Sequence, residues 1–280
     1  MVDITHFTPR DSLKKYIESF VFSKFDFSKE PFTDILIPDG HNELYIQNSS
    51  FTEYKIDAGG FTRPGKYFMT GQMKNAVMAR YGSGFRYVVR FHPWGAHYFL
   101  DAPMSLFTGK MVGIEKAFGR AARRVCDQVI EAAGSESAVE LLQDLFEKKI
   151  TPGVSAETRN DENIIDMVKN IIDSKCITKV MEIMDSSYFG NRHLLRKFNK
   201  IIGLNPKTFI KIMRLNLCIG NIRSEKVVNT DNLLEEYGYY DRSHMVREFK
   251  DILKLTPGSC LEECLRLVGV LIGDAPDGPR

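Results

Sequence analysis

The chain has few cysteines and no long apolar run, and these two features exclude several classes of protein. Its 280 residues include 5 cysteines, scattered between positions 126 and 264 without a C-x-x-C pair. That spacing argues against a disulfide framework or a zinc site. No segment approaches the roughly 20 consecutive apolar residues of a membrane-spanning helix, and the charged N-terminus lacks the apolar core of a signal peptide. We therefore expect a cytoplasmic protein with no membrane contact.

Acidic residues are missing from one stretch near the C-terminus. Residues 1–162 carry 20 Lys and Arg against 21 Asp and Glu, whereas residues 163–266 carry 17 against 13. Between Ser186 and Arg223, 38 residues hold eight basic side chains and no acid. A surface of this kind suits a polyanion, and nucleic acid is the first candidate. The alternative is a solvated helix surface with no ligand.

A fourteen-residue phrase occurs twice within this basic third of the chain. His193–Pro206 reads HLLRKFNKIIGLNP, and His244–Pro257 reads HMVREFKDILKLTP, with six identical positions. Two copies are too few for a solenoid, so we interpret them as one unit used twice on a periodic ligand. Each copy follows a short apolar segment, Ile177–Met184 or Leu233–Tyr237, and a turn. The order predicted twice is helix, turn, exposed helix.

Helical spacing divides each copy into a buried and an outward stripe. The buried stripes are Leu194, Phe198 and Ile201, then Met245, Phe249 and Ile252. The outward stripes are Arg192, Leu195, Arg196 and Asn199, then Ser243, Val246, Arg247 and Lys250. Between the copies, Asn205-Pro206 is a strong helix start. A helix from there to about Arg223 would be roughly 25 Å long at 1.5 Å per residue and would hold the copies at a fixed separation.

The outward residues have the chemistry of duplex recognition. Arginine bonds bidentately to guanine, so Arg196 and Arg247 are candidates for base reading. Pairing with a carboxylate stays open for Arg247, which lies beside Glu248 and Asp251. Leu195 and Val246 suit contact with a thymine methyl group, and partial burial is the alternative. Phosphate contacts are expected from the lysines of this region, Lys197, Lys200, Lys207, Lys211 and Lys250.

These half-motifs, L-x-R-x-F…G-x-x-P and G-Y-x-D-x-S-x-x-x-R-x-F-K…T-P, resemble the AraC/XylS family of bacterial transcription regulators. The match covers roughly residues 163–262. It implies two helix-turn-helix subdomains joined by a linker helix, with recognition helices in successive major-groove segments. The resemblance places Arg192, Leu195 and Arg196 of the first helix, and Arg242, Ser243, Val246 and Arg247 of the second, at base-reading positions. The glycine usual before L-T-P in the second copy is Lys254 here.

The N-terminal half predicts a different kind of structure. Short runs between Phe20 and about Tyr98 alternate in hydrophobicity around Pro-Asp-Gly and Gly-Ser-Gly turns, which indicates antiparallel strands. Residues 82–84 are expected to be a hairpin turn. Two helices follow, the second beginning near Ser135. The phrases LIPDGHNELYI, FMTGQM and VVRFHPWGAHYFL resemble an uncharacterised cupin-like module found before such DNA-binding domains.

The expected fold class is α+β, an antiparallel β-rich, cupin-like domain followed by an all-α double helix-turn-helix domain. The boundaries are 1–150 for a sensory or oligomerising module, 151–162 for a linker, 163–266 for the DNA-binding domain and 267–280 for a flexible tail. The expected partner is double-stranded DNA. A small-molecule effector held among aromatic residues such as Trp94, Tyr45, Tyr54 and Tyr87, a second copy of the chain, and RNA polymerase are further candidates.

An enzyme is the rival interpretation of the N-terminal half. Its one cluster suggestive of metal chemistry is Asp39, His41, Glu43, His92 and His97, but the usual cupin pattern of two histidines separated by one residue is absent. No G-x-S-x-G, P-loop or G-x-G-x-x-G motif occurs. We therefore expect no metal, no cofactor and no enzyme activity, with Asp39-Gly40 forming a structural turn. The alternative, a ligand- or metal-dependent cupin-type enzyme with a basic helical appendage, is tested by elemental analysis.

Overall fold

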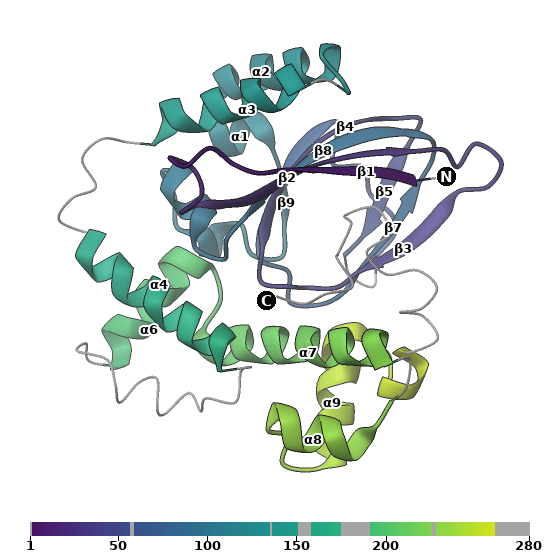
Figure 1. Ribbon diagram of the computed structural model, residues 1–280, viewed down its shortest axis with the longest axis vertical. Coiled ribbons are helices and arrows are strands. Elements are labelled where there is room, and N and C mark those ends of the chain that lie inside the picture. Colours follow the sequence, from purple (N-terminus) through teal and green to yellow (C-terminus); the bar gives the residue numbers. More distant parts are fainter. Residues whose placement is uncertain are drawn as a thin grey trace.

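The computed structural model describes residues 2–56, 59–134, 136–150, 158–174, 191–225 and 228–260. A β-rich module forms its first half and a set of helices its second, so the α+β class expected from the sequence is confirmed (Figure 1). The predicted helix Ile177–Met184 and the predicted tail 267–280 lie outside the described residues. Among the described residues, none of the helices is both long and apolar enough to span a bilayer.

Two antiparallel sheets face each other in the β module. The larger sheet has the order β1-β2-β8-β4-β6-β9, and the smaller has the order β3-β7-β5. The strands are β1 (Val2–Phe7), β2 (Ile17–Phe25), β3 (Phe32–Leu36), β4 (Asn42–Ser49), β5 (Thr52–Lys55), β6 (Tyr67–Thr70), β7 (Val77–Tyr81), β8 (Gly84–Phe91) and β9 (Met111–Gly113). Strand structure therefore begins at Val2, well before the Phe20 expected from the sequence.

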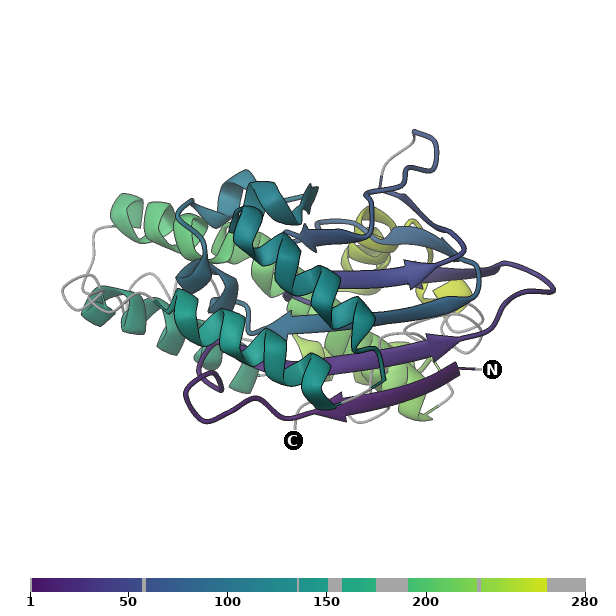
Figure 2. The ribbon, with the colours of Figure 1, turned by 90° about the horizontal axis from the view of Figure 1, so that it is seen from above.

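Each strand of the larger sheet alternates between two cores, as the two-residue period of a strand requires. On β4, Tyr45 faces the smaller sheet, whereas Leu44 and Ile46 face the helices on the other side. Those helices are α1 (Ile114–Phe118), α2 (Arg120–Glu131) and α3 (Glu136–Lys149), with the short 3-10 turns η1 (Gly95–Phe99) and η2 (Met104–Leu106). Figure 2 shows α2 and α3 lying across the larger sheet.

Two turns expected from the sequence have a different role in the structure. The prediction of a hairpin at residues 82–84 is wrong, because β7 pairs with β3 and β5 while β8 pairs with β2 and β4. The Gly-Ser-Gly turn thus carries the chain from one sheet to the other, as residues 37–41 do between β3 and β4. The turn at Asp39-Gly40 is present, since Asp39 Oδ1 accepts a hydrogen bond from the His41 N–H at 3.0 Å and Gly40 has a φ of +83°.

The helical half is built from α4 (Thr158–Asp173), α6 (Asn191–Ile202), α7 (Pro206–Glu225), α8 (Thr230–Tyr237) and α9 (Arg242–Leu253). The helix α4 begins within the predicted linker 151–162, so the last residues of that segment are helical. The three expected apolar residues of each repeat copy are buried in one core, with relative exposures from 0% to 7%. This core also includes Trp94 of the β module, so the two halves share buried surface.

Candidate nucleic-acid interface and cavity

The first repeated helix, α6, presents the outward stripe expected from its spacing. Leu194 and Phe198 are fully buried, and the Phe198 ring packs against Phe209 of α7 with centroids 5.9 Å apart. With these side chains facing inward, Arg192, Leu195 and Arg196 are exposed, and Asn199 is half-buried. Burial therefore orients the four predicted base-reading side chains of α6 away from the helical core.

The second repeated helix, α9, is oriented in the same way. Its N-cap is Asp241, whose Oδ1 accepts a hydrogen bond from the His244 N–H at 2.7 Å. Because Met245, Phe249 and Ile252 are buried, the other side of the helix faces outward. Three of its predicted base-reading residues are exposed and one is half-buried, namely Arg242, Ser243 and Arg247, then Val246.

Carboxylates from other helices engage part of the acid-free stretch. Lys197 Nζ lies 2.9 Å from Asp161 Oδ1, and the two side chains are only 12% and 4% exposed. Arg214 Nη2 lies 2.6 Å from Glu248 Oε1, and Lys211 Nζ lies 3.7 Å from the same oxygen. Lys197 and Lys211 are therefore occupied within the fold, and the pairing competes with the phosphate contacts predicted for them. Of the other predicted phosphate contacts, Lys207 and Lys250 are exposed and Lys200 is half-buried.

The buried position of Glu248 also bears on Arg247. The sequence left open that Arg247 pairs with Glu248, but this carboxylate is 2% exposed and turned inward. It accepts hydrogen bonds from Nε and Nη2 of Arg214 at 3.2 and 2.6 Å. The Arg214 guanidinium also lies over the Tyr239 ring, 4.5 Å from its centroid. Glu248 thus balances the charge of Arg214 on the linker helix, whereas Arg247 is exposed.

The linker helix α7 separates the repeat copies as predicted. Asn205 caps it, with Oδ1 accepting a hydrogen bond from the Thr208 N–H at 2.8 Å, and the helix has 20 residues. Its buried face, which includes Phe209, Ile212 and Met213, packs into the helical core. The predicted fixed spacing of the two copies thus has a single continuous helix as its basis.

Three hydrogen bonds that the sequence did not indicate join the β module to this assembly. Asn216 of α7 donates a hydrogen bond to the Pro38 carbonyl. Thr108 donates to the carbonyl of Gly203, just after α6, at 2.6 Å. The Ala76 N–H donates to the carbonyl of Ile252, near the end of α9, at 2.8 Å. The β module therefore holds the linker helix and the C-terminal ends of both repeated helices.

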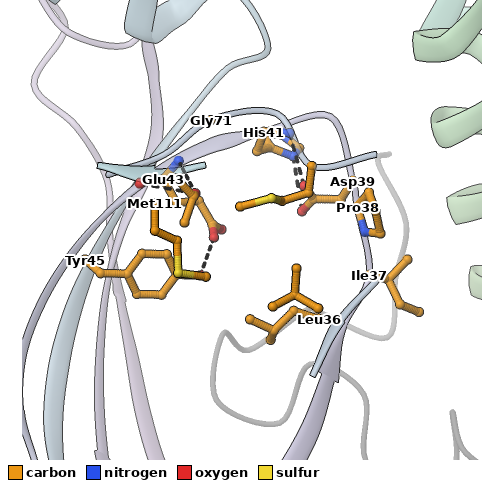
Figure 3. A pocket seen from close by; sticks show the side chains of 12 residues that line it. Leu36, Ile37, Pro38, Asp39, His41, Glu43, Tyr45, Gly71 and Met111 are labelled. Atoms are coloured by element: carbon orange, nitrogen blue, oxygen red, sulfur yellow. Dashed lines mark hydrogen bonds and ion pairs between the residues drawn. The ribbon is translucent and has the colours of Figure 1, made fainter. Parts of the chain in front are cut away.

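Residues 36–40, which we call the rim segment, have two neighbours. On one side a β-carbon at Gly40 would lie 2.7 Å from Met213 Sδ and 3.1 Å from Phe209 of α7. On the other side the rim segment borders a cavity of about 50 Å³ between the two sheets. Figure 3 shows Glu43, Tyr45 and Met111 on one side of this cavity, with Leu36, Ile37 and Pro38 opposite. The remaining lining residues are Asp39, His41, Thr70, Gly71, Met73 and Val77.

Arg90 is the centre of the charged group beside the cavity. Its Nε lies 2.7 Å from Glu18 Oε2 and its Nη1 lies 3.3 Å from Glu43 Oε1, and it also pairs with Asp39. Although burial and Arg90 oppose protonation of His41, Asp39 and Glu18 outweigh them and raise the pKa of His41 to about 10. Burial raises the pKa of Glu43, and the nearby Asp39 adds to this effect against the opposing influence of Arg90.

The structure brings together only part of the cluster considered for metal chemistry. Asp39, His41 and Glu43 meet around Arg90, but His92 stacks on Trp94 with centroids 5.1 Å apart. His97 contacts Tyr98 instead. Among the described residues, no three His, Cys, Asp or Glu side chains are arranged to hold a metal ion. Arg90, which organises the carboxylates, was missed because a lone arginine in a strand gives no local signal.

Of the aromatic residues considered for an effector pocket, Tyr45 lines the cavity. Tyr54 is buried between the sheets, Tyr87 faces the helices of the β module, and Trp94 packs in the helical core. The predicted sensory set is thus distributed over three cores, which suits its alternative role as ordinary core residues.

Comparisons with known proteins give matches for part of the chain and for its fold. Residues 5–113 match a family described as a domain of unknown function, DUF6597. ToxT from Vibrio cholerae is similar in structure at 11% identity, covering 95% of this chain and 98% of that one, with a TM-score of 0.43. A structure of unsaturated fatty acid bound ToxT from the same species has 12% identity, coverages of 93% and 94%, and a TM-score of 0.40.

The AraC-like transcriptional activator CuxR is a more distant neighbour, with 10% identity, coverages of 89% and 80%, and a TM-score of 0.21. No curated protein sequence matches the chain. What this chain recognises has to be argued from its own side chains.

Proposed function

We propose that this chain is a transcription regulator that binds double-stranded DNA in a sequence-specific manner through α6 and α9. The observation that carries the proposal is the repeat itself. Two helices with the same buried stripe precede and follow one 20-residue helix in the chain, and each presents an exposed arginine, Arg196 or Arg247, at the equivalent position. Paired recognition helices held at a fixed separation suit successive major-groove segments of a duplex.

The base-reading set we propose is Arg192, Leu195, Arg196 and Asn199 on α6, with Arg242, Ser243, Val246 and Arg247 on α9. Exposed Lys207 and Lys250 are the stronger candidates for phosphate contacts, since Lys197 and Lys211 have carboxylate partners. A protein with this role acts where the DNA lies, in the bacterial cytoplasm. A second copy of the chain and RNA polymerase remain candidate partners.

Modulation through the β module is supported by the position of the rim segment. Its residues 36–39 line the cavity, while Pro38 and Gly40 contact α7. We propose that a ligand too large for the cavity displaces the rim segment, and this displacement would alter its contacts with Phe209, Met213 and Asn216. We therefore propose that an effector in the β module changes how the linker helix presents α6 and α9.

Selection of bound duplexes from a random pool tests the proposal. Arg196→Ala should cost about 1–3 kcal/mol on the selected site and relax the preference at one or two positions, because a bidentate guanine contact is lost. Lys207→Ala should weaken all sequences alike and reduce the slope of log K against log salt by about one. An unchanged site preference for Arg196→Ala would refute the base-reading assignment, and failure of the wild type to select any sequence would refute the function.

A further inference from the structure

The cavity between the sheets presents acidic groups and no unpaired base among the described residues that line it. Asp39 and Glu43 contribute carboxyl groups, and Thr70 contributes a hydroxyl group. His41 is the basic side chain of the lining, and its ring nitrogens lie 3.3 Å from Asp39 Oδ2 and 3.5 Å from Glu18 Oε2. The charge that a ligand meets on entering is therefore that of the carboxyl groups.

The ion pairs around Arg90 contain more carboxyl groups than cations. Arg90 and protonated His41 face three carboxyl groups, those of Glu18, Asp39 and Glu43. Asp39 and Glu43 both line the cavity, and Glu43 is 8% exposed. A carboxylate ligand would add a fourth acid next to two cations that are already paired. An ammonium group would instead supply the cation that balances Glu43.

The rest of the lining is apolar and adaptable. Leu36, Ile37, Val77 and the methionines Met73 and Met111 enclose the space, and methionine side chains re-pack readily around different shapes. The Tyr45 ring, which stacks on Phe68 with centroids 5.0 Å apart, closes one side of the space. One water molecule needs about 10–15 Å³ of cavity volume. The cavity of about 50 Å³ therefore accommodates a group of a few heavy atoms.

We propose that this cavity is a binding site for a small primary amine with a short apolar body, whose ammonium group pairs with Glu43 and whose chain packs against Met73, Val77 and Met111. The inference rests on the proposed function, because it gives the chemical class of the effector for the same module. When the alkyl chain of the amine enters the cavity, it moves the rim segment. Pro38 and Gly40 transmit this movement to α7.

Three ligands of equal length separate charge from shape, namely n-butylamine, n-butanol and butyrate. Thermal unfolding of the full chain and the fluorescence of Trp94, its only tryptophan, are followed as each ligand is added without DNA. Trp94 lies where the β module meets the helical core, so it reports on their contact. We expect the amine to raise the unfolding temperature at concentrations at least tenfold lower than the other two. Stronger or equal binding of butyrate overturns the proposal.

A matched pair of variants locates the site. Glu43→Gln keeps the shape of the side chain and should weaken amine binding at least tenfold while leaving butanol binding unchanged. Glu53→Gln is the control, because Glu53 pairs with Arg63 and Arg80 and lies outside the cavity lining. Equal amine affinity of the two variants would refute the assignment to Glu43.

If Glu43→Gln does not fold, the wild type still gives the answer through pH. Glu43 faces Arg90, Asp39, His41 and Tyr45, and its pKa is raised, whereas an alkylammonium with a pKa of about 10 stays charged. Amine affinity should therefore increase as the pH rises through the pKa of Glu43, and a flat profile contradicts the pairing. A chain that selects a DNA site but binds no amine refutes only this inference, and one that binds the amine but no DNA refutes only the proposed function.

Discussion

Removal of the Glu248 carboxylate should destabilise the helical half more than loss of an ordinary surface charge. Glu248 is 2% exposed and makes two hydrogen bonds with Arg214 at 2.6 and 3.2 Å. Lys211 and His244 also lie within 3.7 and 3.3 Å of Glu248 Oε1. Glu248→Ala therefore leaves a largely buried guanidinium, with a side chain 12% exposed, without its counter-charge. Breaking a buried pair in this way costs about 3–5 kcal/mol.

Urea unfolding followed by circular dichroism measures this cost, and two further variants separate charge from packing. Glu248→Gln keeps the shape and one acceptor, so it should cost less than Glu248→Ala. The double variant Arg214→Met with Glu248→Leu removes both charges and should recover most of the stability, because the desolvation of both ions is then avoided. A loss below about 1 kcal/mol for Glu248→Ala would place the pair in the range of surface ion pairs and refute the reasoning.

Three shorter predictions concern other sites. Lys197→Ala should leave the salt dependence of DNA binding unchanged, unlike Lys207→Ala. It should lower the free energy of unfolding, because Asp161, which is 3% exposed, loses its partner. A reduced slope of log K against log salt for Lys197→Ala would instead show that Lys197 contacts a phosphate. Lys254→Gly should raise the free energy of unfolding by about 1 kcal/mol, since Lys254 has a φ of +63° that glycine adopts without strain; no gain in a urea titration would contradict this. The pKa of His41 is raised to about 10, so the contribution of its charge to the free energy of unfolding should be complete below its ordinary pKa of about 6.5 and be lost as the pH rises towards 10. His41→Gln should flatten this part of the plot of stability against pH, and an unchanged decline would point to another group.

Local patterns predicted the helical half well because its determinants are local. The spacing of Leu194, Phe198 and Ile201 fixes which face of α6 is buried, and Asn205-Pro206 fixes where α7 begins. The left-handed residue that ends each repeated helix is also readable, as Gly203 with a φ of +90° and Lys254 with +63° occupy equivalent positions. Periodicity and capping act over a few residues, so a single sequence contains them.

What the sequence could not indicate depends on contacts between distant segments. Asn216 meets Pro38 across 178 positions, and no pattern near either residue predicts that pairing. The Gly-Ser-Gly turn was misread because a turn between two strands of one sheet and a turn between two sheets use the same residues. Arg90 and Glu43 are adjacent only because β8 pairs with β4 in a particular register.

The contrast between the two repeated helices is also smaller in three dimensions than in the sequence. The first copy is free of acids and the second contains Glu248 and Asp251, so from the sequence we expect α6 to supply more of the DNA affinity. In the structure Lys197 of the first copy is occupied by Asp161, while Glu248 of the second is turned inward to Arg214 and does not oppose the exposed Arg247. Both ion pairs therefore reduce the difference in unpaired charge between the two copies. The remaining asymmetry lies at two positions, where Arg192 of α6 corresponds to Ser243 of α9 and Lys200 corresponds to the exposed Asp251. Any excess contribution of α6 therefore has to come from these two positions.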